Sequence, residues 1–208
     1  MTTRRTEGHR LGSKRDAAVD TAVLDATRAL LVERGYSGTS IDAIAKRADV
    51  GRPTIYRRWP SKAHIVNDTI YPAVLPELDP ADDLATELGR LIGGAVTVFA
   101  DPAAREAAPG LMNEVRTDAA LHDSLISGQL AGFRAALADR IEAAAQRHEV
   151  RDGLDVDIVI DVIVGAAIFA LSVRDVEDTD ALTSGLTDLL LRGILAPPDT
   201  TTTAPSVD

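Results

Sequence analysis

The stretch Thr39–Lys62, TSIDAIAKRADVGRPTIYRRWPSK, is the most informative part of this chain, because it predicts two short helices joined by a tight turn. Thr39 followed by Asp42 three residues later has the pattern of a capping box, which marks the start of a helix. Apolar side chains then recur on one helical face. This face consists of Ile41, Ile44, Ala45 and Ala48.

A second helix is expected directly after the run Asp49-Val50-Gly51, which breaks the first one. Pro53 is tolerated only in the first turn of a helix, so this helix should begin near Arg52. Its side chains are donors suited to phosphates and to base edges. They are Arg52, Thr54, Tyr56, Arg57 and Arg58. Two short helices, a brief turn and a basic second helix indicate a helix-turn-helix that reads DNA.

Three linked blocks in Thr21–Lys62 resemble the N-terminal domain of the TetR family of transcriptional regulators. The family pattern runs E-R-G-Y/F-x-x-T-S, I-A-x-x-A-G-V and Y-x-x-F-x-S/N-K. The chain has ERGYSGTS at Glu33–Ser40, IAKRADV at Ile44–Val50 and YRRWPSK at Tyr56–Lys62. The resemblance implies an all-α fold, with an N-terminal three-helix helix-turn-helix DNA-binding domain and a C-terminal helical ligand-binding and dimerisation domain.

Three positions depart from the family pattern. Asp49 replaces the usual turn glycine, and Asp tolerates the left-handed conformation better than most residues. Gly51 stands where a serine often caps the recognition helix, so a weaker cap is expected. Trp59 replaces a phenylalanine and is expected to be a core residue rather than a DNA contact.

The expected DNA contacts follow from position in the two helices. Arg52, Pro53 and Thr54 should face base edges, with Arg52 as the candidate for a guanine contact. Tyr56 should bind a phosphate, and Arg57 or Arg58 should add positive charge, although a solvated surface role for Arg58 is equally open. Three residues at helix starts, Thr39, Ser40 and Lys62, can offer donors to phosphates.

Charge is divided unevenly along the chain, whose formal net charge is -10. Residues 1–70 contain 13 Lys/Arg against 8 Asp/Glu, whereas residues 71–208 contain 9 against 24. This asymmetry is typical of a DNA-facing end attached to an acidic body. No cysteine is present, which fits a reducing cytoplasm. Neither a targeting segment nor an uninterrupted apolar run of 18 residues is found, so a cytoplasmic protein without membrane contact is expected.

Composition also predicts the domain boundaries. Residues 1–13 form a basic arm expected to be disordered without DNA, either an ordinary solvated tail or an arm that touches DNA. The helix-turn-helix domain covers 14–60, a connecting helix and linker cover 61–80, the C-terminal domain covers 81–196, and a disordered tail covers 197–208. Within the C-terminal domain, helices are expected at 82–100, 103–112, 118–127, 128–148, 155–172 and 179–195, with Pro109-Gly110 as a break.

The last two expected helices are apolar over more than one face, so each must be covered on both sides. One explanation is burial within the protomer. The other, which the family resemblance implies, is a four-helix interface in a homodimer, as a palindromic operator in double-stranded DNA would require. The expected interface residues are Ile158, Val162, Ala166, Phe169, Leu186, Leu190 and Ile194.

The resemblance also implies an unidentified small-molecule ligand, bound among the helices of the second domain, whose binding releases a repressor from DNA. The candidate lining is apolar, with Arg116 or His122 as a polar group. Gly93-Gly94 either makes room for a ligand or lets two helices approach closely. The apolar candidates are Ile92, Val96, Phe99, Leu111, Met112, Val115 and Phe133.

Two other functions remain open at this stage. A DNA-binding dimer without any ligand would have the same sequence features. A helical enzyme is disfavoured, because the four histidines form no metal-binding spacing and no phosphate-binding loop occurs. The acidic run from Asp152 to Asp161 lacks the glycine and closing glutamate of a calcium loop, and Asp155 is expected to be a helix cap. No cofactor or metal is therefore predicted.

Overall fold

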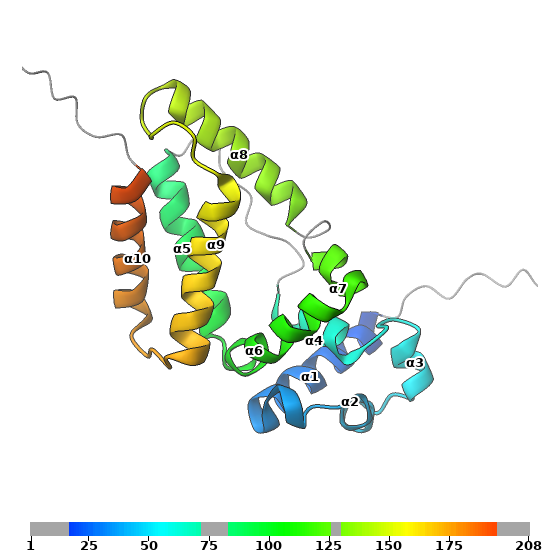
Figure 1. Cartoon of the computed structure of the whole chain (residues 1–208). Helices are drawn as coiled ribbons and strands as arrows, with labels where there is room; N and C mark the ends of the chain where they lie inside the picture. Colours follow the sequence, from blue (N-terminus) through cyan, green and yellow to red (C-terminus); the bar gives the residue numbers. More distant parts are fainter. Residues whose placement is uncertain (1–16, 72–82, 126–129, 195–208) are drawn as a thin grey trace, which may run out of the picture.

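The computed structural model describes residues 17–71, 83–125 and 130–194, which form helices joined by short connections. Figure 1 shows the first four helices gathered at one end and α5, α9 and α10 aligned side by side at the other, with α6 and α7 between them. The expected basic arm, most of the proline-containing linker and the C-terminal tail lie outside the described residues.

The N-terminal domain consists of α1 (Ala17–Gly38), α2 (Ile41–Ala48), α3 (Arg52–Tyr56) and α4 (Lys62–Ile70). Its core is apolar and contains Trp59, whose exposed fraction is 6% and whose indole nitrogen donates to Asp68 at 2.8 Å. The prediction that Trp59 is a core residue is therefore confirmed. The core residues are Val23, Leu30, Ile44, Ala45, Ile55, Trp59 and Ile65.

Gly35 interrupts α1 with a non-helical backbone conformation. Its φ of 66° is positive and its ψ is -179°, so it lies outside the left-handed helical region. That combination is open almost only to glycine. A Cβ at this position would also lie 3.3 Å from a carboxylate oxygen of Glu106. The backbone conformation therefore requires glycine, whereas the Glu106 side chain could move by a few tenths of an ångström to admit a Cβ.

The C-terminal body contains the remaining helices, close to the expected ranges. A π-helical turn, Phe169–Val173, continues α9. The body has its own apolar core, centred on Leu88, Ile92, Val96, Leu137 and Ile163. The helices are α5 (Leu84–Ala100), α6 (Pro102–Thr117), α7 (Ala119–Asp123), α8 (Ala131–Gln146), α9 (Val156–Ile168) and α10 (Thr179–Ile194).

The expected helix break at Pro109-Gly110 is wrong, because α6 runs through both residues. Pro109 lies on the exposed side of the helix, where water can bind the carbonyl that has lost its helical donor. Gly110 instead serves packing. An ideal Cβ on Gly110 would lie 2.3 Å from Cδ1 of Tyr36, so the ring of Tyr36 occupies the space that a side chain would need.

Gly110→Ala should destabilise the fold, because the Tyr36 ring must move to admit the methyl group. We expect a loss of about 1–3 kcal/mol in the free energy of unfolding, measured by urea denaturation. Gly132→Ala on α8 is the matched control, since nothing lies within 4 Å of its Cβ position. That variant should be as stable as the parent or more stable. Equal stability of both variants would contradict the packing of Tyr36 on Gly110.

A second apolar cluster joins the two ends of the molecule. Leu31 of α1 and Val66 of α4 pack there against α6, whose contact face is made of small residues. Ala103, Ala104 and Ala107 are each fully buried in this contact. Alanines allow the helix backbones to approach closely, so α6 lies directly against the DNA-binding domain.

One apolar window, interrupted by Asp157 and Asp161, spans α9 and the π-helical turn after it. The 18 residues Val156–Val173 have a mean hydropathy of 2.4. By length and composition alone, this segment is long and apolar enough to cross a membrane. One face of this segment, with Val159, Ile163 and Ala167, is buried in the core of the body. Core packing thus accounts for that face, and the other face is described below.

Candidate nucleic-acid interface

Local hydrogen bonds define the turn between α2 and α3. Ser40, rather than Thr39, is the N-cap of α2: its Oγ accepts from the amide of Ala43 at 3.2 Å. The capping box expected at Thr39 is therefore wrong by one residue. Asp49 adopts the left-handed conformation, with φ 53° and ψ 43°, as its side chain permits. Gly51 begins α3 without a side-chain cap, as expected from its lack of a side chain.

One buried residue determines which side of α3 faces outward. Ile55 is fully buried in the N-terminal core, so the opposite face of this short helix is presented to solvent. Tyr56 is 54% exposed and Thr54 is half-buried. The exposed side chains on and beside α3 are Arg52, Pro53, Tyr56 and Arg57. Of the expected base-reading residues, Arg52 and Pro53 are thus accessible, and Thr54 beside them is half-buried.

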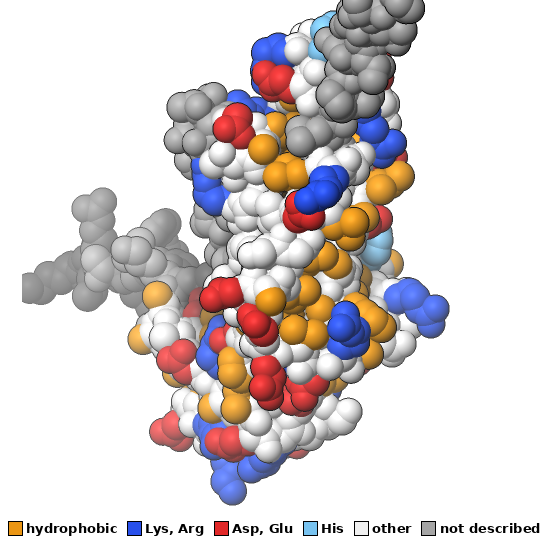
Figure 2. Space-filling view, turned by 90° about the vertical axis from the view of Figure 1, so that its left-hand side faces the viewer, with side chains coloured by type: hydrophobic (Ala, Val, Ile, Leu, Met, Phe, Trp, Pro, Cys, Tyr) orange, Lys and Arg blue, Asp and Glu red, His pale blue; other side chains and the backbone are white. Residues whose placement is uncertain are grey.

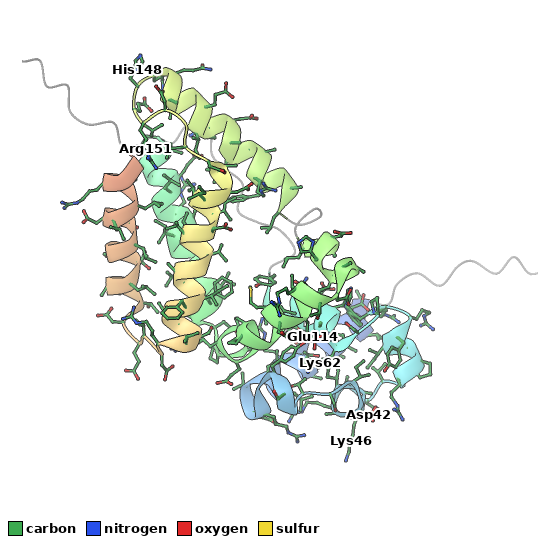
Figure 3. The ribbon with its side chains drawn as sticks, in the orientation of Figure 1. Asp42, Lys46, Lys62, Glu114, His148 and Arg151 are labelled. Atoms are coloured by element: carbon green, nitrogen blue, oxygen red, sulfur yellow. The ribbon has the colours of Figure 1, made fainter. Side chains whose placement is uncertain are left out.

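Two of the arginines in this region have partners within the protein. Arg52 Nη1 lies 2.8 Å from Oδ1 of Asp42 on α2, and both side chains are more than half exposed. Figure 3 shows Asp42 on the outer edge of the domain, beside Lys46. Arg58 is only 7% exposed and is paired with Asp20 of α1. Of the two arginines expected to add positive charge, Arg57 is therefore the accessible one. Arg58 instead connects α1 to the turn after α3 through its ion pair with Asp20.

Two residues expected to offer donors to phosphates are engaged elsewhere. Thr39 is 2% exposed, and its hydroxyl donates to the carbonyl of Gly35 at 2.9 Å. The Nζ of Lys62 donates to the carbonyl of Tyr36 at 3.0 Å and lies 3.7 Å from the centre of its ring. Burial lowers the pKa of Lys62, and the nearby Glu114 acts in the opposite direction. Both side chains therefore hold α1 to its neighbours, a role that their sequence positions did not reveal.

The pKa of Tyr36, whose ring contacts the ammonium group of Lys62, is also shifted. Burial, with a smaller contribution from Glu114, raises the pKa of its hydroxyl far above the usual range. Figure 3 shows Lys62 and Glu114 beside each other at the contact of α4 with α6. Tyr36, Lys62 and Glu114 thus form a contact between the DNA-binding domain and the body.

The candidate ligand-lining residues do not form one pocket. Ile92, Val96 and Phe99 are buried in the core of the body, and Phe133 packs against that core. Leu111 and Val115 belong to the separate cluster that joins α6 to α1 and α4. Three further candidates are exposed: Met112, Arg116 and His122. Because the set is split between two cores and the surface, these side chains do not line one common pocket within the described part of the chain.

A cavity of about 810 Å³ lies between α5 and α10, and it includes only Val96 from the expected set. Gly89 and Gly93 of α5 face α10 there: a Cβ on Gly93 would come 3.9 Å from Cγ2 of Thr183. Gly93 therefore lies next to α10, and its lack of a side chain leaves space in the cavity. The lining is Gly89, Arg90, Gly93, Val96, Thr97, Ala100, Asp101, Thr179, Asp180 and Thr183.

The second face of α9 carries an exposed apolar stripe. Figure 2 shows hydrophobic side chains gathered on the face that carries α9 and α10. Among the expected interface residues, Ile158, Val162 and Phe169 are exposed and Ala166 is half-buried. Leu186 and Leu190 instead pack against the core of their own protomer, and the side chain of Ile194 lies outside the described part. Two apolar residues outside the expected interface set are also strongly exposed: Val173 at 60% after α9 and Leu189 at 69% on α10.

No group of three or more His, Cys, Asp or Glu side chains suited to a metal ion occurs among the described residues. Asp155 caps α9 by accepting from the amide of Asp157 at 2.8 Å, so its expected role as a helix cap is confirmed.

A helix-turn-helix with a basic exposed helix, packed on a separate helical body, defines a DNA-binding regulatory protein. The comparisons agree. Residues 23–69 match the model for bacterial regulatory proteins of the tetR family, and residues 78–190 match the model for the tetracyclin repressor-like C-terminal domain. The chain belongs to the TetR family of transcriptional regulators.

Its relatives match over most of their length. It is 26% identical over 189 residues to the HTH-type transcriptional regulator YdeS of Bacillus subtilis, covering 89% of this chain and 94% of that protein. It is 30% identical over 175 residues to the HTH-type regulator Rv1556 of Mycobacterium tuberculosis, covering 81% and 84%. The fold matches the regulator FadR from Bacillus subtilis, solved with stearoyl-CoA, with a TM-score of 0.62 at 20% identity, covering 84% and 98%.

Proposed function

We propose that this regulator is a cytoplasmic repressor that binds a palindromic operator as a homodimer and is released by a small molecule. The observation that carries the proposal is the pairing of a basic, outward-facing α3 with an exposed apolar stripe at the other end of the molecule. Covering the stripe with a second copy would present two recognition helices, which can then occupy successive major grooves about 34 Å apart.

The interface we propose centres on α9. Its outward apolar residues Ile158 and Val162 lie four positions apart, and Phe169 follows seven positions later, at the start of the π-helical turn. Leu189 of α10 is also exposed. Large exposed aliphatic and aromatic side chains in one stripe mark an association surface rather than a solvated face. A symmetric interface uses the same patch on both partners, which such a stripe permits.

In the DNA complex, we assign base reading to Arg52, with Pro53 and Thr54 beside it, and phosphate binding to Ser40, Tyr56 and Arg57. Arg52 would exchange its exposed pairing with Asp42 for a guanine, at little cost because an exposed ion pair contributes little stability. Ser40 is exposed, and its hydroxyl hydrogen remains available while its oxygen caps α2.

Arg52→Ala should weaken binding to the selected operator by about 1–3 kcal/mol and relax the preference at one base pair in each half-site. Fluorescence anisotropy on a selected operator and on its single-base variants measures both effects. Arg57→Ala is the matched comparison: a lost phosphate contact in each half-site should weaken all sequences alike and lower the salt slope by about 1 per half-site. Unchanged base preference in Arg52→Ala would place the recognition contacts elsewhere.

For the effector, we propose the cavity between α5 and α10. Its volume of about 810 Å³ falls within the range usual for small-molecule sites, roughly 300–1,000 Å³. It combines threonine hydroxyls and charged side chains with the apolar contacts of Val96 and Ala100. The FadR structure with stearoyl-CoA shows that a neighbour of this fold accepts a ligand. The alternative is a dimer that represses without any effector.

Gly93→Leu should weaken effector binding, because its side chain would project into the cavity beside Thr183. The test is a thermal-shift screen of a compound library, repeated on the variant and on Gly94→Leu, whose Cβ position has nothing within 4 Å and does not line the cavity. Compounds that stabilise the parent and Gly94→Leu but not Gly93→Leu support this site. Stabilisation of all three would move the site, and the absence of any hit would favour the effector-free alternative.

A further inference from the structure

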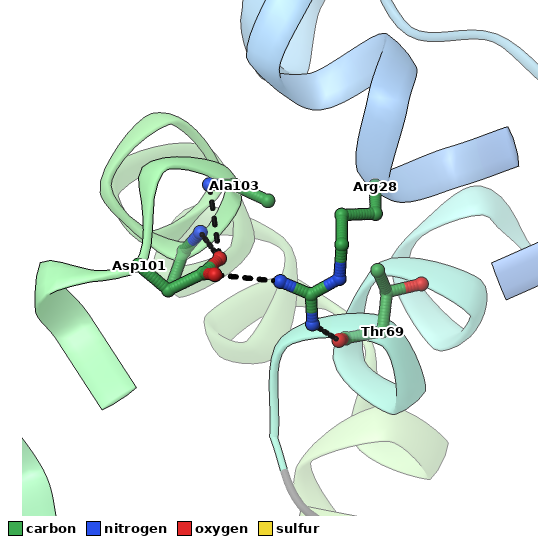
Figure 4. A network of polar contacts seen from close by, with 5 residues as sticks. Arg28, Thr69, Asp101 and Ala103 are labelled. Atoms are coloured by element: carbon green, nitrogen blue, oxygen red, sulfur yellow. Dashed lines mark hydrogen bonds and ion pairs between the residues drawn. The ribbon is translucent and has the colours of Figure 1, made fainter. Parts of the chain in front are cut away.

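One guanidinium joins three helices at the boundary between the DNA-binding domain and the body. Arg28, in the middle of α1, donates from Nη1 to Oδ2 of Asp101 at 2.7 Å and from Nη2 to the carbonyl of Thr69 at 2.8 Å (Figure 4). Thr69 belongs to the last turn of α4, and Asp101 lies between α5 and α6. The side chain therefore ties the reading domain, the end of α4 and the start of α6 together.

Asp101 is held in place by a second set of bonds. Its Oδ1 accepts from the amides of Ala103 and Ala104 at 3.0 and 3.2 Å, so the same carboxylate caps α6. A cap fixes the carboxylate relative to the helix axis. Arg28 is thus bound to a carboxylate whose position is fixed relative to α6, rather than to a freely moving side chain.

The next turn of α6 is fastened to the opposite part of the body. Arg105 donates to the carbonyl of Leu171 at 3.0 Å, to that of Val176 at 3.1 Å and to Oδ1 of Asp175 at 2.9 Å. These acceptors lie at the junction between α9 and α10, the helices of the apolar stripe. A continuous series of contacts therefore runs from the stripe, through α6, to α1.

The contacts along α6 differ in how easily they can open. The buried alanines and the Tyr36 ring on Gly110 form a tight apolar contact. The Arg28–Asp101 pair is partly solvated instead, with side chains 44% and 37% exposed, so water can replace either partner. Asp101 also lines the cavity between α5 and α10. The polar bridge is thus the contact that can break while the apolar contact holds.

We infer that Arg28 is a positioning residue for operator recognition: its bridge to Thr69 and Asp101 sets the angle of the DNA-binding domain on the body, and with it the separation of the two recognition helices. The inference rests on the dimeric DNA binding proposed above. Loss of the bridge lets the domain rock about the apolar contact without unfolding. An effector bound in the cavity between α5 and α10 acts on the Arg28–Asp101 bridge through Asp101, which lines that cavity.

The first test measures domain orientation without DNA. The chain has no cysteine, so Lys46→Cys and Arg151→Cys provide two unique spin-label sites, both exposed and at opposite ends of the molecule (Figure 3). Labelled protein is diluted with unlabelled protein so that the distances measured lie within one chain. Arg28→Ala should broaden the distance distribution by pulsed electron paramagnetic resonance. An unchanged distribution overturns the inference.

Three further variants separate the bridge from folding. Asp101→Asn keeps an oxygen for the cap but removes the ion pair, and it should broaden the distribution as Arg28→Ala does. Arg28→Lys should not restore the parent distribution, because one ammonium lacks the two-pronged reach of the guanidinium. Arg147→Ala removes an exposed pair with Glu149 inside the body and is the matched control. All variants should share the thermal midpoint of that control.

The second test measures spacing on DNA. Operators selected by the parent are lengthened or shortened by one base pair between the half-sites, and affinities are compared. The parent should discriminate against altered spacing, and Arg28→Ala should reduce that discrimination about fivefold or more, at the lower end of usual coupling between sites. Broadened distances with unchanged spacing preference overturn the positioning role. If no operator is selected at all, the proposed function fails, while the spin-label result still decides the bridge.

Discussion

Val162→Arg should convert the proposed homodimer into monomers. Val162 lies in the middle of the apolar stripe on α9 and is 42% exposed in the protomer, so a charged side chain there can be solvated without disturbing the fold. In the proposed dimer the guanidinium would be buried without a partner. We expect a loss of about 2–4 kcal/mol of association free energy, in the range of interface hot spots. This corresponds to a dissociation constant about 30- to 1,000-fold higher.

Sedimentation velocity over a concentration series measures this change. Ala136→Arg is the matched control, because it places the same charge on an exposed position of α8, away from the stripe. The control should remain dimeric and bind the operator with the parent's affinity. Val162→Arg should also bind a full operator no better than a half-site. A dimer that persists in Val162→Arg would place the interface on another surface.

The helix-turn-helix was predictable because its signals are local. Asp49 has the left-handed conformation expected at this position of the turn. Pro53 lies in the first turn of α3, as its missing amide hydrogen requires. Trp59 is buried, at the position where the family pattern has a phenylalanine. The turn and the helix start depend on residues only a few positions away, so backbone preference suffices for them, whereas the burial of Trp59 was expected from the family resemblance.

Contacts between distant segments were not predictable in the same way. Thr39 has the spacing of a capping box, but its hydroxyl is taken by Gly35 and Ser40 caps the helix instead. Lys62 is paired with Tyr36, which is far from it in sequence. Pro109 and Gly110 form a strong local break signal, yet tertiary packing of Tyr36 on Gly110 decides the outcome. Local preference fails where a partner from another helix supplies the larger energy.

The two-sided apolar helix α9 was recognised from sequence, but its division between core and surface was not. Val159 and Ile163 face the body, whereas Ile158 and Val162, one position earlier in each case, form the stripe. Leu186 and Leu190 were assigned to the interface but pack inward, and Leu189 between them is exposed. When both faces are apolar, hydrophobic periodicity contains no information about which face meets the protomer's own core.

A buried charge in the body is a feature that sequence reading missed altogether. The side chain of Glu87 on α5 is fully buried, and Nε of Arg140 on α8 donates to its Oε2 at 2.8 Å. The other oxygen of Glu87 accepts no hydrogen bond from the described residues. Arg140 is 24% exposed, so its far end can reach water. The two partners therefore depend on each other unequally: Glu87 needs Arg140 more than Arg140 needs Glu87.

Arg140→Met should accordingly be among the most damaging single changes in the body, because it leaves the Glu87 carboxylate buried without its guanidinium. Breaking a buried pair from one side costs about 3–5 kcal/mol. For a chain of this length, that corresponds to a fall of roughly 6–20 °C in the thermal midpoint. Differential scanning calorimetry at neutral pH measures the shift.

The same pair predicts a compensating double change. Glu87→Leu alone should cost less than Arg140→Met, because the remaining arginine can be solvated. Combining Glu87→Leu with Arg140→Met replaces the pair with apolar side chains and should return the stability close to that of the parent, or above it. Additive losses in the double variant would instead mean that the two side chains contribute independently. Recovery would show that the pair joins α5 to α8 by mutual neutralisation rather than by packing, since only then does removing the second partner reverse the loss of the first.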